Sequence, residues 1–276
     1  MSKLTPEDVV LRYSKRGMNV LKKYLKDGYC RTAAEKLLHA ERGTVLLTTG
    51  FYVAGYAETD GPLGTVAVAE ALNHLGFHSV VVTDKYCKGF FELKQLDVEY
   101  VDIAADEQVY EDILDKYHPV YMISIERCGE NAEHEYANMR GVSITSETAA
   151  IDHLFELAPE KHIPTIGVGD GGNEIGMGNV KDIISEKLEL NPCVVPVDDL
   201  IIATTSNWGA YALTAWLQKL SGEEVLFTFA EAEPYLAATL EIGSVDGVLK
   251  EKKMGVDGFD MTVEKEILDS LAEAIA

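Results

Sequence analysis

The chain has 276 residues, and 24 Lys and Arg stand against 46 Asp and Glu, which gives a formal net charge of −22 at pH 7. A chain of this length can bury one sizeable core, so we expect a single domain over residues 1–276. The strong negative charge argues against nucleic acid and membrane surfaces as partners, because both are anionic. Such acidity usually belongs to a solvated surface, although part of it suits a cation-binding cavity.

The cysteines and the apolar runs indicate the compartment. Cys30, Cys87, Cys128 and Cys193 are scattered and form no C-x-x-C pair. They therefore provide neither a zinc motif nor a disulfide framework, which indicates a reducing environment. Residues 1–16 are charged throughout and lack an apolar signal core, and residues 45–57 are too short to span a bilayer. We expect a cytoplasmic protein.

Residues 1–43 are predicted to form two N-terminal helices. Thr5-Pro6-Glu7-Asp8 combines a cap, a first-turn proline and two acids, which is how helices commonly begin. Apolar residues at roughly helical spacing continue from there, and Gly28 would end the helix. A second amphipathic helix is predicted over residues 32–41.

In residues 44–220, short apolar runs alternate with amphipathic segments. The predicted strands are 45–49, 79–83, 98–102, 120–125, 163–168 and 200–204. The predicted helices are 64–75, 90–95, 107–117, 147–157, 179–188 and 208–220. Such alternation predicts an α/β fold, a doubly wound and mostly parallel sheet with helices on both faces. An eightfold barrel would need more strand–helix pairs.

Residues 221–276 are predicted to form a helical tail. Helical patterns cover residues 223–242, with an interruption near Pro234, and residues 263–276. The apolar positions Leu236, Leu240 and Ile242 could pack on the sheet or on another subunit, so a homo-oligomer is one outcome. Between the two patterns, Val-Asp-Gly occurs twice, at Val245 and Val256, which is too short to define a repeat.

The most informative stretch is GVGDGGNEIGMG, residues 167–178, in which six of twelve residues are glycine. Glycine permits positive φ angles and close approach of the backbone to a ligand. We therefore predict a loop bent around a ligand, with Asp170 and Glu174 pointing inward. A tight structural turn with solvated acids is the alternative.

Carboxylates follow four of the predicted strands. Ligands of open parallel sheets bind beyond the carboxyl ends of the strands, so these side chains should converge. Ser206 is placed to cap the helix after the sixth strand. The acids are Glu58 and Asp60 after the first strand, Asp84 after the second, Glu126 after the fourth, and Asp170 with Glu174 after the fifth.

Acids that gather in this way are protonated, paired with Arg127, or bound to a cation. Oxygen ligands favour Mg²⁺ or Mn²⁺ over zinc, and Glu126, Asp170 and Glu174 are the expected ligands of a divalent metal. The alternatives are that Asp84 only caps the next segment and that Glu126 only pairs with Arg127.

The glycine stretch does not indicate a nucleotide. No Lys-Ser/Thr follows the glycines, so it is not a Walker A motif. Gly167, Gly169 and Gly172 fit G-x-G-x-x-G, but they follow the fifth strand and lack a second strand that ends in an acid. A phosphate or dinucleotide site stays a weaker alternative, and we expect no nucleotide cofactor.

Several motifs together resemble the D-glutamate cyclase family. The resemblance covers residues 44–257, and the chain looks like the free-standing microbial form without the additional N-terminal domain of eukaryotic members. Cys128 stands where the family usually has proline, and residues 131–135 also differ. The motifs are TGF at 49–51, ETDGPLG at 58–64, IER at 125–127, NMRG at 138–141, TIGVGDGGNEIGMGN at 165–179 and SNWGAYAL at 206–213.

The resemblance implies conversion of D-glutamate, a small acidic substrate, to 5-oxo-D-proline and water. The α-amine attacks the γ-carboxyl carbon, so a base, an acid and a group that stabilises the oxyanion are needed. Glycine-loop amides or a metal could stabilise the oxyanion. We assign proton transfer to Glu174 or Asp170, and metal binding to Glu126 with Asp170.

The same resemblance suggests the substrate contacts. Arg127 and Arg140 would hold the two carboxylates, since a planar guanidinium suits them, while Asn173, Ser206 and Asn207 would orient the substrate. The remaining predicted contacts are Thr49, Gly50, Asp60, Gly171 and Gly172. Two rival functions are a metal-dependent hydrolase or phosphatase acting on a small anion, and a non-catalytic sensor of acidic metabolites.

Overall fold

The computed structural model describes residues 4–276, and within this range six parallel strands form one sheet in the order β5-β4-β1-β6-β7-β8. The chain runs outward from β1 to β5 and then from β6 to β8, so the direction switches between β1 and β6. The predicted doubly wound α/β fold is confirmed. The strands are β1 (Thr44–Thr48), β4 (His78–Thr83), β5 (Asp97–Tyr100), β6 (Tyr121–Ile125), β7 (Thr165–Gly169) and β8 (Asp199–Ile202).

The central strands form because their side chains are apolar on both faces. In β4, Val80, Val81 and Val82 are fully buried, and every residue of β6 is buried. A strand covered on both faces reads as a continuous apolar run, which is why the central strands were predictable, whereas the edge strand β5 is only partly buried. In register, Leu47 pairs with Val81 on one side and with Ile123 on the other.

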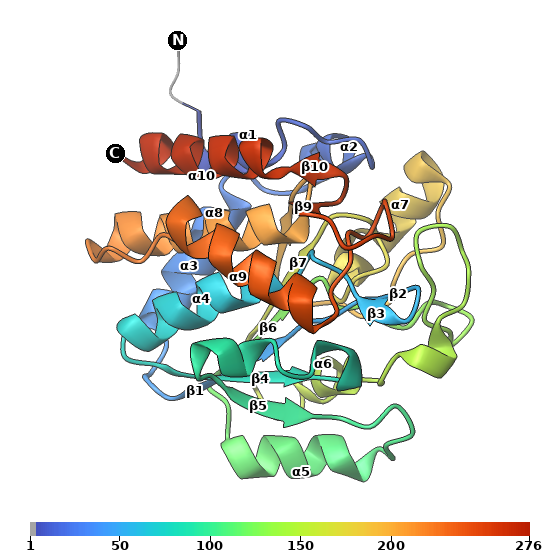
Figure 1. Ribbon diagram of the computed structural model, residues 1–276. Helices are drawn as coiled ribbons and strands as arrows, with labels where there is room; N and C mark the ends of the chain where they lie inside the picture. The colour runs from blue at the N-terminus through green and yellow to red at the C-terminus, as the bar shows by residue number, and fades with distance from the viewer. Residues whose placement is uncertain (1–3) are drawn as a thin grey trace.

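Helices cover both faces of the sheet (Figure 1). On one face lie α3 (Tyr29–His39), α4 (Pro62–His74) and α8 (Ser206–Ser221), whereas α5 (Gln108–Tyr117) and α6 (His153–Leu157) lie on the other. α4 and α8 cross closely at Gly64, where an added Cβ would come within 2.7 Å of the Ala210 Cβ. This close contact brings the N-termini of the two helices together.

The tail forms α9 (Phe229–Ile242) and α10 (Met261–Ile275), which pack outside α4 and α8. Leu236 and Leu240 are buried within the chain. The predicted interruption near Pro234 is wrong, because Pro234 lies inside α9 with its side chain on the exposed face. The first Val-Asp-Gly begins a loop, and the second overlaps β9 (Gly255–Val256) and leads to β10 (Phe259–Asp260).

The N-terminal segment departs from the prediction of one long first helix. The capping box between Thr5 and Asp8 does begin α1 (Pro6–Val10), but the chain then turns before α2 (Met18–Leu21) and η1 (Lys22–Tyr24). Gly17 takes a φ of +87° at this turn, and an added Cβ would come within 2.3 Å of Leu188. The turn directs Arg16 inward.

The predicted helix over residues 147–157 is also shorter than expected. Only α6 and the short η4 (Thr145–Glu147) form there, because tertiary hydrogen bonds use the groups between them. The carbonyl of Ala149 accepts from Arg127, and the Asp152 carboxylate accepts from the Tyr136 hydroxyl and the Glu130 amide. The remaining elements are β2 (Tyr52–Val53), β3 (Tyr56–Ala57), η2 (Lys85–Cys87), η3 (Phe91–Lys94), η5 (Met177–Val180) and α7 (Lys181–Leu188).

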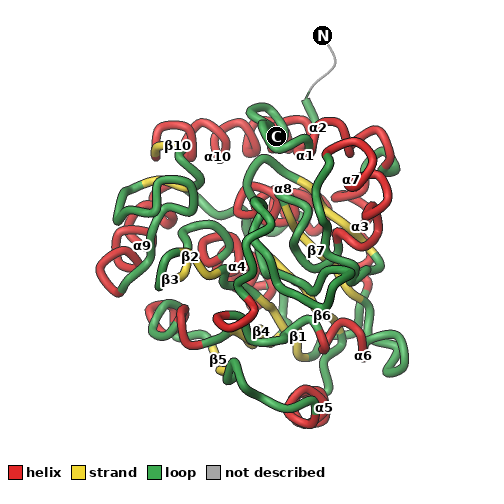
Figure 2. Tube along the Cα trace, turned by 90° about the vertical axis from the view of Figure 1, so that its right-hand side faces the viewer, coloured by secondary structure: helices red, strands yellow, loops and turns green. Residues whose placement is uncertain are grey.

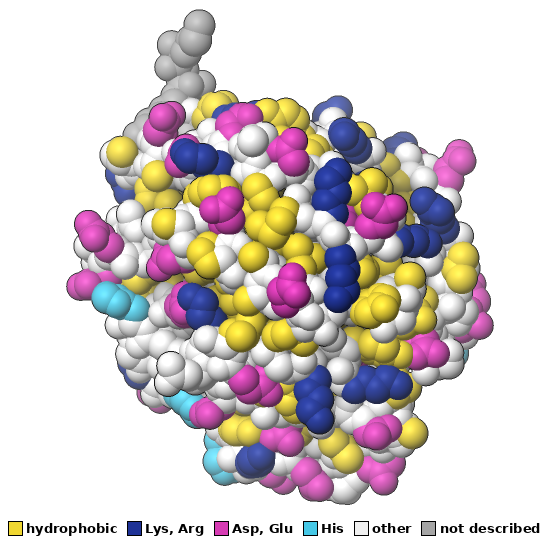
Figure 3. Space-filling model, in the orientation of Figure 1, with side chains coloured by type: hydrophobic (Ala, Val, Ile, Leu, Met, Phe, Trp, Pro, Cys, Tyr) yellow, Lys and Arg dark blue, Asp and Glu magenta, His cyan; other side chains and the backbone are white. Residues whose placement is uncertain are grey.

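Acidic side chains are scattered over the face shown in Figure 3 and form no continuous field there. This distribution fits the expectation that most of the negative charge is solvated. Among the helices of residues 4–276, none combines the length and the apolar character needed to cross a membrane.

Candidate active site

Three carboxylates meet where the direction of the sheet switches. Asp60 follows β1 and precedes α4, Glu126 follows β6, and Asp170 follows β7. One carboxylate oxygen of each lies within 4.8 Å of the others, and all three side chains are buried. Figure 2 views the molecule from the side toward which the strands point, with the loops of this edge in front. We call Asp60, Glu126 and Asp170 the acidic triad.

Asp60 lies at the N-terminus of α8. Its carboxylate accepts hydrogen bonds from the backbone amides of Ser206 (2.8 Å), Asn207 (2.7 Å) and Gly61 (3.0 Å). Burial, followed by the negative charge of Asp257, nevertheless raises the pKa of Asp60 to about 7. The cap of α8 is Thr205, not Ser206 as predicted.

Glu126 is held in a strained conformation and is bonded by Ser206. Its φ of +50° lies in the left-handed region, which non-glycine residues rarely adopt and which often marks a functional site. The Ser206 hydroxyl donates to Glu126 Oε2 at 2.5 Å. Burial, followed by the charges of Asp170 and Glu174, raises the pKa of Glu126 well above its ordinary value. Burial thus disfavours the ionised form of Glu126.

Asp170 binds an arginine that the sequence analysis missed. Arg16 Nη1 lies 2.6 Å from Asp170 Oδ1, and Arg16 Nη2 lies 2.7 Å from Asp257 Oδ2. The other oxygen, Asp170 Oδ2, is buried and has no hydrogen-bond partner among residues 4–276. Burial raises the pKa of Asp170, and the Arg16 charge opposes this shift. The only sequence signal for Asp257 was the second Val-Asp-Gly.

Glu58 adds a further buried acid next to the triad. Burial is the main cause that raises its pKa well above the ordinary value, followed by the charges of Asp257 and Asp60. The first Val-Asp-Gly packs directly on it, since a Cβ at Gly247 would come within 1.7 Å of Glu58 Oε2. The predicted convergence of acids from separate strand ends therefore includes the tail loop.

Glu174 does not belong to the triad, so the predicted metal group of Glu126, Asp170 and Glu174 is corrected to one with Asp60. The Glu174 carboxylate accepts from the backbone amides of Asp170 (3.2 Å), Gly171 (2.6 Å) and Gly172 (2.7 Å). It closes the glycine loop on itself. Because Gly171 and Gly172 already donate to Glu174, their amides do not form the predicted oxyanion site.

Arg127 is buried and bound by protein groups. Its Nη1 donates to Asp84 Oδ2 (2.6 Å) and to the Gly50 carbonyl (2.9 Å), and its Nη2 donates to the Ala149 carbonyl (2.6 Å). Asp84 also caps η2 through the Tyr86 amide, so the alternative that Asp84 only caps the next segment accounts for one of its two contacts. The alternative pairing of Glu126 with Arg127 is not seen. The predicted contact of Arg127 with a substrate carboxylate does not fit these partners.

Three other predicted contacts have structural partners or lie outside the buried site. Asn207 Oδ1 accepts from the amides of Gly61 (2.9 Å) and Gly64 (2.7 Å), which joins the starts of α4 and α8. Asn173 Nδ2 donates to the Ala137 carbonyl at 2.8 Å. Arg140 is exposed on a turn.

Thr49, which was predicted to contact the substrate, lies in the buried site. Its Oγ1 is buried and has no hydrogen-bond partner within residues 4–276. A Cβ at Gly61 would come within 2.6 Å of this oxygen and 3.0 Å of the Glu126 Cβ, so Thr49 lies beside the triad. Gly50 has a φ of +100°, and its carbonyl positions Arg127.

The donor set of the triad fits a hard divalent cation. Three carboxylates from three segments offer oxygens close enough to share one ion, and Asp170 Oδ2 has no hydrogen-bond partner in the part of the chain that the structure describes. Oxygen donors of this kind suit Mg²⁺ or Mn²⁺. The buried acidic triad could therefore bind a metal.

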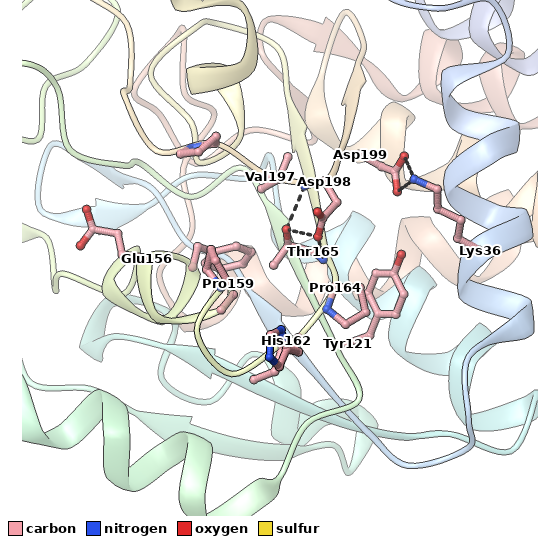
Figure 4. A pocket seen from close by; sticks show the side chains of 14 residues that line it. Lys36, Tyr121, Glu156, Pro159, His162, Pro164, Thr165, Val197, Asp198 and Asp199 are labelled. Carbon is pink, nitrogen blue, oxygen red and sulfur yellow. Dashed lines mark hydrogen bonds and ion pairs between the residues drawn. The ribbon is translucent and has the colours of Figure 1, made fainter.

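A separate groove of about 930 Å³ lies at the opposite edge of the sheet (Figure 4). It is lined by Thr165 and Asp199, the first residues of β7 and β8, and by apolar side chains such as Pro159. Two pairs of its polar side chains bind each other: Lys36 Nζ donates to Asp199 at 2.7 Å, and the Thr165 hydroxyl donates to Asp198 at 3.1 Å. The groove is thus distant from the triad, and we assign it no role.

The buried acids predict how stability depends on pH. Glu58, Asp60, Glu126 and Asp170 have raised pKa values in the folded state, so the folded chain binds more protons than the unfolded chain. Their contribution is most favourable below the ordinary carboxyl pKa. It is lost as pH rises through the folded values, about 7 for Asp60.

We therefore expect a lower Tm at about pH 8 than at about pH 5 when both are measured with EDTA. The Asp60→Asn variant should show a smaller decrease, because one of the responsible groups is gone. A Tm that rises between these pH values would contradict the raised pKa values of these buried acids.

Comparisons with known proteins place the chain in a family. Residues 7–272 match the family described as D-glutamate cyclase-like, C-terminal. A human protein named D-glutamate cyclase, mitochondrial, is 32% identical over 259 residues, and the match covers 80% of this chain and 40% of that protein. The chain thus spans less than half the length of this relative.

Two solved structures are less similar. The match to a UDP-glucose 4-epimerase from Brucella ovis in complex with NAD has 16% identity, covers 54% of this chain and 49% of that chain, and has a TM-score of 0.33. The match to a ligand-free aldohexose dehydrogenase from Thermoplasma acidophilum has 11% identity and a TM-score of 0.29. It covers 86% of this chain and 88% of that chain. At these TM-scores neither structure informs the function. The match over residues 7–272 shows that the chain belongs to the D-glutamate cyclase-like family.

Proposed function

We propose that this protein converts D-glutamate to 5-oxo-D-proline and water. The family membership supports this reaction, and the observation that carries it is the acidic triad, buried at the switch point of the sheet. Cyclisation needs a proton acceptor for the substrate ammonium and a proton donor for the departing oxygen. A group of carboxyls with raised pKa values can supply both near neutral pH.

Asp170 is the proposed proton acceptor. Its Oδ2 is buried and accepts no hydrogen bond from residues 4–276, whereas Oδ1 is held by Arg16. The substrate ammonium would donate to Oδ2 and transfer one proton there, which leaves a neutral amine. Only the neutral amine has the electron pair that forms the C–N bond to the γ-carboxyl carbon.

Glu126 is the proposed proton donor. Its raised pKa keeps a proton on the carboxyl group, and the Ser206 hydroxyl fixes the position of Oε2. As the C–O bond of the tetrahedral intermediate breaks, this proton passes to the departing hydroxyl, which leaves as water. The proton held by Asp170 passes to a γ-carboxylate oxygen of the intermediate and makes it the departing hydroxyl. As the lactam forms, the amine nitrogen returns its second proton to Glu126, so Asp170 ends as the carboxylate and Glu126 as the acid, as they began.

A divalent cation is the alternative to proton transfer by these acids, because a carboxylate that binds a cation carries no proton. Asp60, Glu126 and Asp170 would then hold Mn²⁺ or Mg²⁺, whose positive charge would polarise the γ-carboxyl group. This proposal expects no nucleotide cofactor.

The direct test is to incubate the purified protein separately with D-glutamate, L-glutamate and a generic phosphate ester, each with EDTA, Mn²⁺ or Mg²⁺. We expect 5-oxoproline from D-glutamate, at a rate above the uncatalysed cyclisation, and no phosphate release. Hydrolysis of the ester without cyclisation would favour the rival hydrolase. A ligand-induced rise in Tm without any product would favour a metabolite sensor.

A further inference from the structure

Arg16 stands at the boundary between the buried acids and the solvent. Its side chain is 24% exposed, whereas the side chains of its partners Asp170 and Asp257 are 1% and 3% exposed. Among the ion pairs of residues 4–276, Arg16 is the cation that contacts the acidic triad. An anion that approaches the triad from solvent would therefore meet a guanidinium first.

The site is otherwise unfavourable to a dicarboxylate substrate. Glu58, the triad and Asp257 surround it with carboxyl groups. The γ-carboxyl group can lie beside protonated acids, because it accepts protons from them and loses its negative charge when an oxygen leaves as water. The α-carboxylate does not react and keeps its charge, so it needs a positive partner.

Arg16 and Asp170 together match the α-amino acid group. An ammonium and a carboxylate are attached to the same carbon of the substrate. In the protein, Arg16 Nη1 and Asp170 Oδ1 form an ion pair at 2.6 Å, so a cation and an anion lie equally close together. Asp170 Oδ2 is free to accept from the ammonium. A guanidinium carries five N–H donors in a plane, more than its two carboxylate contacts use.

Resting on the proposed function, we propose that Arg16 binds the α-carboxylate of the substrate and so makes the site selective for α-amino dicarboxylates. Arg16 thus takes the role that the sequence suggested for Arg127 and Arg140. Gly17 supports it, because its packing on Leu188 fixes the turn that directs Arg16 inward.

The test compares binding of 5-oxo-D-proline with binding of 2-pyrrolidinone, which is the same ring without the carboxylate. Titration calorimetry should show that Arg16→Gln weakens the binding of 5-oxo-D-proline by about 10- to 100-fold, the usual effect of losing a hydrogen bond to a charged group. Binding of 2-pyrrolidinone should change less than about twofold. Arg16→Lys keeps the charge and should recover part of the loss.

Arg12→Gln is the matched control. Arg12 lies in the same segment, but it pairs with Glu266 at 2.5 Å, away from the triad. It should leave binding of both ligands unchanged.

If Arg16→Gln weakens the binding of both ligands equally, Arg16 is only structural. Unchanged binding of 5-oxo-D-proline by this variant would also overturn the inference. So would a wild-type protein that binds neither ligand. If Arg16→Gln does not fold, the same comparison on Arg16→Lys decides, because displacing the guanidinium fork must weaken only the carboxylate ligand. The proposed function is judged separately, from cyclisation of D-glutamate by the wild-type protein.

Discussion

The variant Glu126→Gln is expected to lower kcat for D-glutamate cyclisation by about 10²- to 10⁴-fold, the usual contribution of a general acid or base. Glutamine has the same size and can still accept from the Ser206 hydroxyl, which lies 2.5 Å from Glu126 Oε2. It cannot release a proton to the departing oxygen. The measurement is the steady-state rate of 5-oxo-D-proline formation by protein whose Tm shows that it is folded.

Glu130→Gln is the control for this variant. Glu130 is a nearby acid on the same loop, and its carboxylate contacts His134 instead of the triad. Its kcat should stay within about twofold of wild type. Near-normal turnover by folded Glu126→Gln would remove Glu126 from the mechanism.

The variant Arg127→Leu is expected to lower the free energy of unfolding by about 3–5 kcal/mol, which is typical when one partner of a buried ion pair is removed. The change leaves Asp84 buried without its partner at 2.6 Å, and it also removes the bonds that hold Gly50 and Ala149. Urea unfolding at neutral pH measures the effect.

Lys265→Leu is the matched control for an ion pair. Lys265 and Asp269 are paired on an exposed face of α10, with side chains 54% and 58% exposed. Exposed pairs contribute little, so this variant should unfold almost as wild type does. If Arg127→Leu were equally stable but failed to bind 5-oxo-D-proline, the original prediction of a substrate contact would be right.

The sequence was sufficient to predict the sheet and the edge of the sheet at which Glu126 and Asp170 meet. β1, β4, β6 and β7 are buried on both faces, so each stands out as a continuous apolar run, and parallel strands must bring their carboxyl ends to one edge. Glu126 and Asp170 were identified from this geometry alone. Their detailed partners were not, because hydrogen bonding depends on side-chain direction.

The misassigned residues show what a pattern along the chain cannot supply. Arg16 and Asp257 are separated from Asp170 by long stretches of sequence, and only the turn at Gly17 and the tail loop bring them to it. Arg127 sits next to Glu126 in sequence, but successive side chains point in different directions, and Arg127 turns to Asp84. Glu174 lies close enough to its own loop to bond the backbone of Gly171 and Gly172.

The central claim is that Glu126 and Asp170 act together in one buried site. The most direct measurement is kcat/KM for D-glutamate in Glu126→Gln, Asp170→Asn and the combined variant. If both residues serve one reaction centre, the combined variant should be within about threefold of the worse single variant, because the effects of such residues are not additive. A combined loss equal to the product of the two single losses would show that they act independently and would contradict this account.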